Sequence, residues 1–340
     1  MWQGQQPPRR PDGVTLGPVA MGGHDLSSIR SELRALVDSG RVPSAAYAVV
    51  TDAGVAAGGF GGAGPETVFQ IGSVTKAVTG LLLADMAERG QVLLSDPASK
   101  YLQGAPPGRV TLLDLATHTS GLPRLPPGLL RYALLRPGDP YAWYPAGAFV
   151  RAARRSLATA AGQQPYLYSN YGFGLLGYLL SQAVEAPYPK LAEQRVCGAL
   201  GMSATTFDAT PVQGYCGGRP VGPWHMGVLS AAGGLHSTAT DLARLLAACL
   251  APETTDLSAA VCAALTPRVT TSPKAEIGLA WHHALRDGKR VIWHNGMTGG
   301  FSAMVALNPA RRAGAVVLAN DGGAPPSPLD ALVLDALFES

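Results

Sequence analysis

Residues 69–90 have the sequence FQIGSVTKAVTGLLLADMAERG, which contains the clearest helical pattern in the chain. Apolar side chains recur there at three- and four-residue intervals, which places them on one face of a helix. They are Val78, Leu81, Leu82 and Met86. Ser73 suits the N-cap, and Gly90 suits the position after the last helical residue. The pattern therefore predicts a helix over 73–89.

The start of this helix, Ser73-Val74-Thr75-Lys76, carries a hydroxyl and an amine one turn apart. Residues at i and i+3 share a face with Cβ atoms about 5–6 Å apart, so Ser73 and Lys76 can meet. A serine becomes a nucleophile when a base removes its proton. An amine can be that base if burial and the helix N-terminus lower its pKa. Taken alone, the four residues are more simply a capping serine and a solvated lysine.

Strand patterns lie at both ends of the chain, around a mostly helical middle. Upstream, a helix over 25–39 precedes two β runs, 45–51 and 54–59, which predict a hairpin. Further helices are predicted in the middle over 111–117, 171–184 and 240–250, the first with Thr111 and Asp114 as a capping box. The last third predicts strands over 277–283, 290–294, 301–307 and 313–319, a turn over 309–312 and a helix over 329–338.

This order of elements predicts an α/β fold of the α+β type. An antiparallel sheet, built from the N- and C-terminal segments and flanked by helices, carries an inserted, mainly helical lobe. Residues 1–24 are polar and rich in Pro and Gly, and we expect a flexible leader there. Residues 25–340 form one catalytic domain, with the sheet lobe at about 25–70 and 266–340 and the helical lobe at about 71–265.

Two further motifs carry candidate chemistry. Tyr168-Ser169-Asn170 precedes the 171–184 helix, where Asn170 could cap. A tyrosine near a lysine can have its pKa lowered and share in proton transfer; the alternative is a helix cap beside a core tyrosine. The segment WHNGMTGGF at 293–301 lies at a predicted strand end, where Gly296 lets a substrate approach the backbone closely. Its alternative is a glycine-rich hairpin.

Together the three motifs resemble, in order and spacing, those of the serine β-lactamase and penicillin-binding-protein superfamily. The chain is similar to its class C β-lactamase-like branch, which includes D-Ala-D-Ala carboxypeptidases, β-lactamase-fold esterases and transacylases. Supporting segments are FQIG at 69–72, HTSGLP at 118–123, GGL at 233–235 with Ser237 and Asp241, and LAN at 318–320. The likeness runs from about 25 to 340 and implies a β-lactamase/transpeptidase-like fold.

The resemblance implies roles for individual residues. Ser73 attacks a carbonyl and carries the acyl group, while Lys76 and Tyr168 move its proton and later activate the acceptor. Asn170 hydrogen-bonds the substrate or Lys76. The backbone N–H groups of Ser73 and Met297 form an oxyanion hole, and donors of this kind are worth about 10²–10³ in rate each.

His294 is a departure within the third motif, because β-lactamases have lysine at this position and other members often have histidine. A permanent cation favours carboxylate-bearing substrates such as penicillins, whereas a histidine with a pKa near 6.5 is largely neutral at pH 7. The substrate-binding residues are expected to be Asn170, His294, Gly296 and Met297.

Composition and further motifs disfavour other classes. With 26 basic and 23 acidic residues the net charge is +3, without the clustered basic face of a nucleic-acid binder. Residues 1–25 lack the apolar run of about 7–15 residues of a secretory signal, so we expect a cytoplasmic protein. The uncharged stretch 156–184 contains polar residues that argue against a membrane span. The GFGLLG segment at 172–177 lacks a preceding buried strand, and the sequence has no HExxH, so we expect no cofactor and no metal.

The sequence therefore predicts a serine acyl-transfer enzyme, an esterase or transacylase acting through a Ser73 acyl-enzyme. Its partners are a small-molecule ester, thioester or amide as acyl donor and water, an alcohol or an amine as acceptor. We expect no nucleic acid and no membrane partner, and the oligomeric state stays open. The alternatives are a D-Ala-D-Ala carboxypeptidase or β-lactamase and, from another class, a catalytically inactive ligand-binding homologue.

The segment 122–164 is rich in arginine and is expected to shape specificity. Its arginines are Arg124, Arg131, Arg136, Arg151, Arg154 and Arg155. They could contact an acidic or phosphorylated part of a substrate, although a solvated face is the simpler interpretation. Trp143 and Tyr144 could line an acyl pocket, against the simpler interpretation of core or rim positions.

Overall fold

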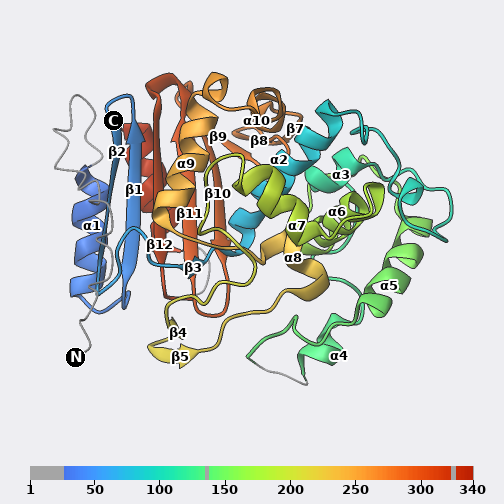
Figure 1. The fold of residues 1–340 in the computed structure, drawn as a ribbon, viewed down its shortest axis with the longest axis horizontal. Coiled ribbons are helices and arrows are strands. Elements are labelled where there is room, and N and C mark those ends of the chain that lie inside the picture. The colour runs from blue at the N-terminus through green and yellow to red at the C-terminus, as the bar shows by residue number, and fades with distance from the viewer. Residues whose placement is uncertain (1–26, 135–137, 323–326, 340) are drawn as a thin grey trace, which may run out of the picture.

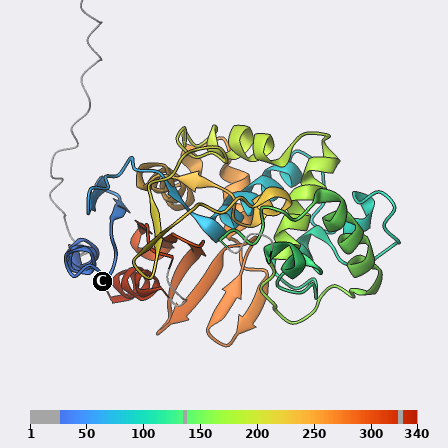
Figure 2. The same cartoon turned by 90° about the horizontal axis from the view of Figure 1, so that it is seen from below.

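The computed structural model describes residues 27–134, 138–322 and 327–339, so the predicted leader lies outside the described residues. Figure 1 shows an eight-stranded sheet on one side of the molecule and a group of helices on the other. The same division is visible from below in Figure 2. Among the described residues, no helix is long and apolar enough to cross a membrane.

The large sheet joins the two ends of the chain. Its strand order is β2-β1-β12-β11-β10-β9-β8-β7, and every neighbouring pair is antiparallel. The strands are β1 (Ala45–Thr51), β2 (Gly54–Phe60), β7 (Val269–Ser272), β8 (Ala275–Ile277), β9 (His282–Arg286), β10 (Lys289–Met297), β11 (Ser302–Asn308) and β12 (Ala313–Ala319). Ala45 lies opposite Ala319, which pairs the first strand with the last. The predicted antiparallel sheet of N- and C-terminal segments is confirmed.

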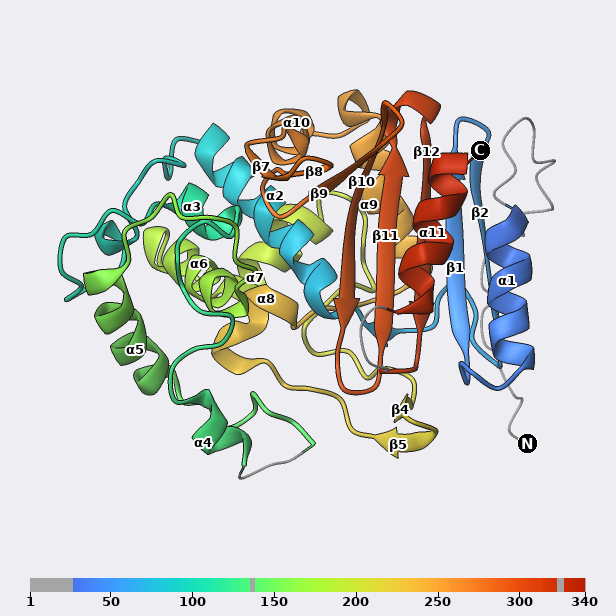
Figure 3. The same cartoon turned by 180° about the vertical axis from the view of Figure 1, so that it is seen from behind.

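Helices cover both faces of this sheet. On the face seen in Figure 3, α1 (Ser27–Asp38) and α11 (Pro328–Glu339) pack against the strands. On the other face, α9 (Ala239–Leu250) contacts β12 and β1. Every residue of β12 is buried, which explains why its sequence AGAVVLA is apolar throughout instead of alternating.

The helical side of the molecule comes from the middle of the chain. Its helices are α2 (Thr75–Glu88), α3 (Leu112–Ala116), α4 (Leu129–Ala133), α5 (Ala146–Thr159), α6 (Asn170–Ala183), α7 (Tyr188–Ala192), α8 (Ser230–Gly233) and α10 (Ser258–Leu265). Two small sheets pair β3 (Phe69–Gln70) with β6 (His236–Ser237) and β4 (Gly214–Cys216) with β5 (Arg219–Val221). The predicted capping box of Thr111 and Asp114 is present at the start of α3. The lobe boundaries stay a prediction, and α9, from the predicted helical lobe, packs on the sheet.

The helix predicted over 73–89 is α2, and it is buried on nearly all sides. Its start differs from the prediction, because Ser73 lies in a 3₁₀ turn (Gly72–Val74) and Val74 occupies the N-cap without a side-chain cap. The Ser73 hydroxyl is hydrogen-bonded to Lys76 instead of to the helix backbone. Gly90, at a φ of +68°, follows the helix as predicted.

The strand predicted over 277–283 was wrong, because two strands, β8 and β9, replace it. Between them the backbone N–H of Leu279 donates to the Ala264 carbonyl and that of Ala280 to the Ala116 carbonyl. Both carbonyls lie at helix ends. They accept the N–H groups that a continuous strand would donate to a neighbouring strand. The local apolar pattern could not reveal partners so distant in sequence.

Gly80 marks the tightest packing of α2 against this connection. A Cβ at Gly80 would lie 2.2 Å from the Leu279 carbonyl oxygen, which belongs to the backbone and cannot swing aside. Alanine in a helix interior gains about 1 kcal/mol over glycine, but forced overpacking costs about 1–3 kcal/mol. We expect Gly80→Ala to lower the free energy of unfolding, as measured by denaturant titration.

Gly222→Ala is the matched control, because a Cβ there meets nothing within 4 Å. Its unfolding midpoint should stay near that of the parent protein. A Gly80→Ala protein as stable as the control would contradict the close approach of α2 to residue 279.

Candidate active site

Ser73, Lys76 and Tyr168 meet where the start of α2 faces the turn before α6. Lys76 Nζ lies 2.8 Å from Ser73 Oγ and 2.5 Å from the Ala232 carbonyl oxygen. The same nitrogen is 4.9 Å from the centre of the Tyr168 ring. The structure therefore brings together the hydroxyl, amine and phenol that the sequence singled out.

The Lys76 side chain is fully buried. Burial lowers its pKa well below the ordinary lysine value, and the nearby positive charge of Arg124 lowers it further. An uncharged amine can donate one hydrogen to the Ala232 carbonyl and accept one from the Ser73 hydroxyl. The arrangement thus gives Lys76 the protonation state of a base.

Tyr168 differs from the expectation that a neighbouring lysine would lower its pKa. Burial raises the pKa of the phenol above its ordinary value and outweighs the opposing effects of the hydrogen bond to Ser73 and of Arg124. A lysine that is itself desolvated carries little positive charge with which to stabilise a phenolate. Tyr168 therefore keeps its proton and is a hydrogen-bond donor.

Two glycines set the contact between β10 and the turn that carries Ser73. A Cβ at Gly296 would lie 1.9 Å from the Ile71 carbonyl oxygen and 2.9 Å from the Ser73 nitrogen. A Cβ at Gly72, whose φ is +48°, would lie 2.7 Å from the Met297 nitrogen. The backbones of Ser73 and Met297 consequently lie along the same seam.

His294 is buried beside this seam and is uncharged. Burial lowers its pKa well below the ordinary histidine value, with further lowering by His282 and Lys76. Its Nδ1 donates to the Asn295 carbonyl oxygen at 2.7 Å, so Nε2 is an acceptor, and no described residue is its partner. The position that holds a lysine in β-lactamases therefore supplies no positive charge here.

Asn170 is the first residue of α6 and not its cap. Ser169 is the N-cap, because its Oγ accepts the Gly172 N–H at 2.8 Å. Asn170 Oδ1 is buried without a hydrogen-bond partner among the described residues. In the described part of the chain, the hydrogen-bond partners of Lys76 Nζ are Ser73 and Ala232, not Asn170.

His118, for which the sequence predicted no role, forms hydrogen bonds with the residues before and after Tyr168. Its backbone carbonyl accepts the Leu167 N–H at 2.9 Å, and its Nδ1 accepts the Ser169 N–H at 3.0 Å. Its ring lies 4.5 Å from the Tyr168 ring, centre to centre. His118 has a φ of +59°, a conformation that costs a residue with a side chain about 1–2 kcal/mol. The HTSGLP segment at 118–123 pointed to this residue. Its role could not be predicted, because it depends on a contact with Ser169, 51 residues further along the chain.

Trp143 and Tyr144, the two aromatic residues considered for an acyl pocket, differ in exposure. Trp143 is 56% exposed, and Tyr144 is buried with its hydroxyl donating to the Pro127 carbonyl. Tyr141 and Trp224 pack together with ring centres 5.4 Å apart, and a Cβ at Gly299 would lie 2.6 Å from the Trp224 ring nitrogen. A role of Trp143 and Tyr144 in an acyl pocket stays a prediction.

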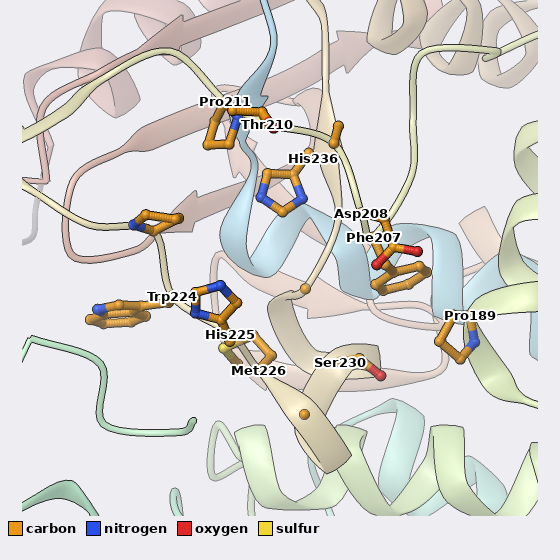
Figure 4. Close-up of a pocket in the computed structure, with 14 residues that line it drawn as sticks. Pro189, Phe207, Asp208, Thr210, Pro211, Trp224, His225, Met226, Ser230 and His236 are labelled. Carbon is orange, nitrogen blue, oxygen red and sulfur yellow. The ribbon is translucent and has the colours of Figure 1, made fainter. Parts of the chain in front are cut away.

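The structure contains a cavity of about 490 Å³, which Figure 4 shows in close-up. Its walls include Phe207, Trp224, Met226 and His236, and it borders Ser230 at the start of α8. Ser73, Lys76 and Tyr168 are not among the residues that line it.

The support of Tyr168 by His118 can be tested with two variants. The Oδ1 of asparagine can accept the Ser169 N–H in place of the histidine Nδ1, and asparagine tolerates a positive φ. Alanine has no such acceptor and tolerates a positive φ poorly. We expect His118→Ala to slow labelling of Ser73 by a fluorophosphonate about 10- to 100-fold, since a misplacement of about 1 Å can cost 10²-fold. His118→Asn should retain most of the rate. Equal rates for both variants would contradict this role, and thermal unfolding of each checks that the fold is intact.

Comparisons with known proteins identify the family to which the chain is similar. The Beta-lactamase family model matches residues 29–338. The D-alanyl-D-alanine-carboxypeptidase/endopeptidase AmpH of Escherichia coli (strain K12) is 30% identical over 283 residues, which cover 74% of this chain and 71% of AmpH. A β-lactamase of Pseudomonas fluorescens is 30% identical over 300 residues, covering 75% of this chain and 80% of that protein.

The fold has a counterpart among solved structures. A class C β-lactamase from Rhodobacter sphaeroides superposes with a TM-score of 0.77 at 23% identity, over 92% of this chain and 99% of that chain. The sheet, the helices around it and the position of α2 are thus those of the class C fold. With a family match that spans nearly all of the described residues, the chain belongs to the beta-lactamase family of serine hydrolases.

Proposed function

We propose that this chain is a serine acyl-transfer enzyme, an esterase or transacylase that forms an acyl-enzyme at Ser73. The observation that carries the proposal is the desolvated Lys76 amine, 2.8 Å from Ser73 Oγ, with a protonated Tyr168 beside both. A base of lowered pKa and an acid of raised pKa around one hydroxyl are what acyl transfer needs.

In the first step, the Ser73 hydroxyl gives its proton to Lys76 while Oγ forms a bond to the substrate carbonyl carbon. The carbonyl oxygen becomes an oxyanion, for which the backbone N–H groups of Ser73 and Met297 are the proposed donors. The bond to the leaving group then breaks, and the leaving group takes a proton from Tyr168. Lys76 returns the proton to Tyr168, so the acyl-enzyme forms with both groups restored.

The second step follows the same path in reverse. Water, an alcohol or an amine gives its proton to the Lys76 and Tyr168 pair and attacks the acyl carbon, which releases Ser73. Water as acceptor gives hydrolysis, whereas an alcohol or amine gives acyl transfer.

The neutral state of His294 supports esters, thioesters or amides over β-lactams as substrates. A penicillin carries a carboxylate, and an uncharged imidazole buried at position 294 offers it no permanent charge. A second candidate, D-Ala-D-Ala carboxypeptidase or β-lactamase activity, is favoured by the names of the two relatives that are 30% identical. A ligand-binding homologue without turnover is the candidate from another class.

The pH dependence follows from the two shifted groups. Lys76 is active when unprotonated, and its lowered pKa keeps it so at pH values well below the ordinary lysine range. Tyr168 is active when protonated, and its raised pKa extends activity above the ordinary tyrosine range. We expect kcat/KM for a neutral ester to fall only on the acidic side between pH 5 and pH 10. A rate that rises throughout the range up to pH 10 would contradict Lys76 as the base.

Covalent labelling separates the three candidate functions. We expect a fluorophosphonate to add to the wild-type protein at Ser73 and not to Ser73→Ala, as seen by intact-protein and peptide mass spectrometry. Loss of the nucleophile should reduce ester turnover by at least about 10³-fold. Turnover of 4-nitrophenyl esters without turnover of penicillin G or a D-Ala-D-Ala peptide supports the esterase or transacylase. The reverse supports the second candidate, and no adduct with any reagent supports the ligand-binding homologue.

A further inference from the structure

Arg124 brings a permanent positive charge to the site. Its charge acts on Lys76 and Tyr168, where it lowers both pKa values, and it acts in the same direction on His118, Tyr141 and Tyr166. Burial lowers the pKa values of His294 and Lys76, whereas Arg124 is exposed and carries a permanent positive charge.

The backbone holds Arg124 in place beside Tyr168. Its carbonyl oxygen accepts the N–H groups of Asn170 at 2.9 Å and of Tyr171 at 3.2 Å, which are the first donors of α6. The guanidinium carbon lies 5.3 Å from the centre of the Tyr168 ring. A residue tied to the start of α6 in this way keeps a fixed distance from the reacting groups, whatever its side chain is.

Among the described residues, the guanidinium contacts the Tyr168 ring, and its N–H groups have no acceptor. In the described residues, Arg124 forms no ion pair and no side-chain hydrogen bond, and the residue is exposed. The stretch 122–164 has six arginines and one acidic residue, Asp139. Asp139 is buried and accepts hydrogen bonds from Tyr141, Ala142 and His225, so it does not neutralise Arg124.

We propose that Arg124 binds a carboxylate of the substrate on the Tyr168 side of the site. This rests on the proposed function and names its substrate class: a small acyl ester, thioester or amide that carries one carboxylate. A guanidinium fits a carboxylate by two parallel hydrogen bonds, and one unpaired arginine matches one negative charge.

Two pairs of esters test the proposal, each pair differing by one carboxylate. The acyl pair is 4-nitrophenyl hexanoate and mono-4-nitrophenyl adipate, and the leaving-group pair is phenyl butyrate and 3-carboxyphenyl butyrate. The readout is the ratio of kcat/KM for the charged and neutral members, measured on the pH plateau of each protein. The ratio cancels changes that affect both members, such as a changed Lys76 pKa.

We expect Arg124→Gln to lower this ratio about 10- to 100-fold in one pair, since a hydrogen bond to a charged group is worth about 1.5–3 kcal/mol. The loss should appear as a raised KM, and Arg124→Lys should restore part of it. Arg131→Gln, in the same segment and exposed, is the control and should leave the ratio unchanged. In the wild type, 0.5 M NaCl should reduce the ratio, because salt screens exposed charges. The affected pair shows whether the carboxylate belongs to the acyl group or to the leaving group.

Three results would overturn the proposal. If the ratio of kcat/KM for the charged and neutral esters is the same in wild type and Arg124→Gln for both pairs, Arg124 does not bind the substrate carboxylate. A ratio that falls equally in Arg131→Gln shows an effect of overall charge alone. If the wild type hydrolyses none of the four esters and takes no fluorophosphonate at Ser73, the proposed function fails, and the Arg124 proposal fails with it. Turnover and labelling with an unchanged ratio overturn only the latter.

Discussion

The removal of one amine from water is the condition on which the site depends. Lys76 lies in a helix that is buried on nearly all sides. Among the described residues, the hydrogen-bond partners of its nitrogen are the Ser73 hydroxyl and the Ala232 carbonyl. An ammonium ion at such a place would be costly, so the proton is lost and the group becomes a base. The large core on both sides of α2 is what keeps water away from it.

The second constraint is the close approach of two backbones. The end of β10 and the turn before α2 approach so closely that neither Gly72 nor Gly296 has room for a Cβ. Through this seam the sheet side of the molecule, made from the chain's ends, is fixed against the helical side, made from its middle. The backbones of Ser73 and Met297 are therefore held side by side, although the two residues are more than 200 positions apart in sequence.

The third motif has histidine instead of lysine at position 294, so the permanent positive charge beside Tyr168 is that of Arg124. Histidine at 294 is neutral because it is buried and because it lies near His282 and Lys76. The exposed guanidinium of Arg124 lies next to the Tyr168 ring. A lysine base with a lowered pKa is compatible with this charge, since Arg124 itself contributes to the lowering.

Local spacing was sufficient to predict α2, the 45–59 hairpin, the capping box at Thr111, the antiparallel sheet class and the Ser73, Lys76 and Tyr168 set. The break between β8 and β9, the 3₁₀ position of Ser73, the support of Tyr168 by His118 and the direction of the Tyr168 pKa could be recognised only from contacts in three dimensions. Each of these depends on burial or on a partner far away in the chain. Hydrophobic periodicity records which face of a segment is covered, but not which carbonyl, ring or charge covers it.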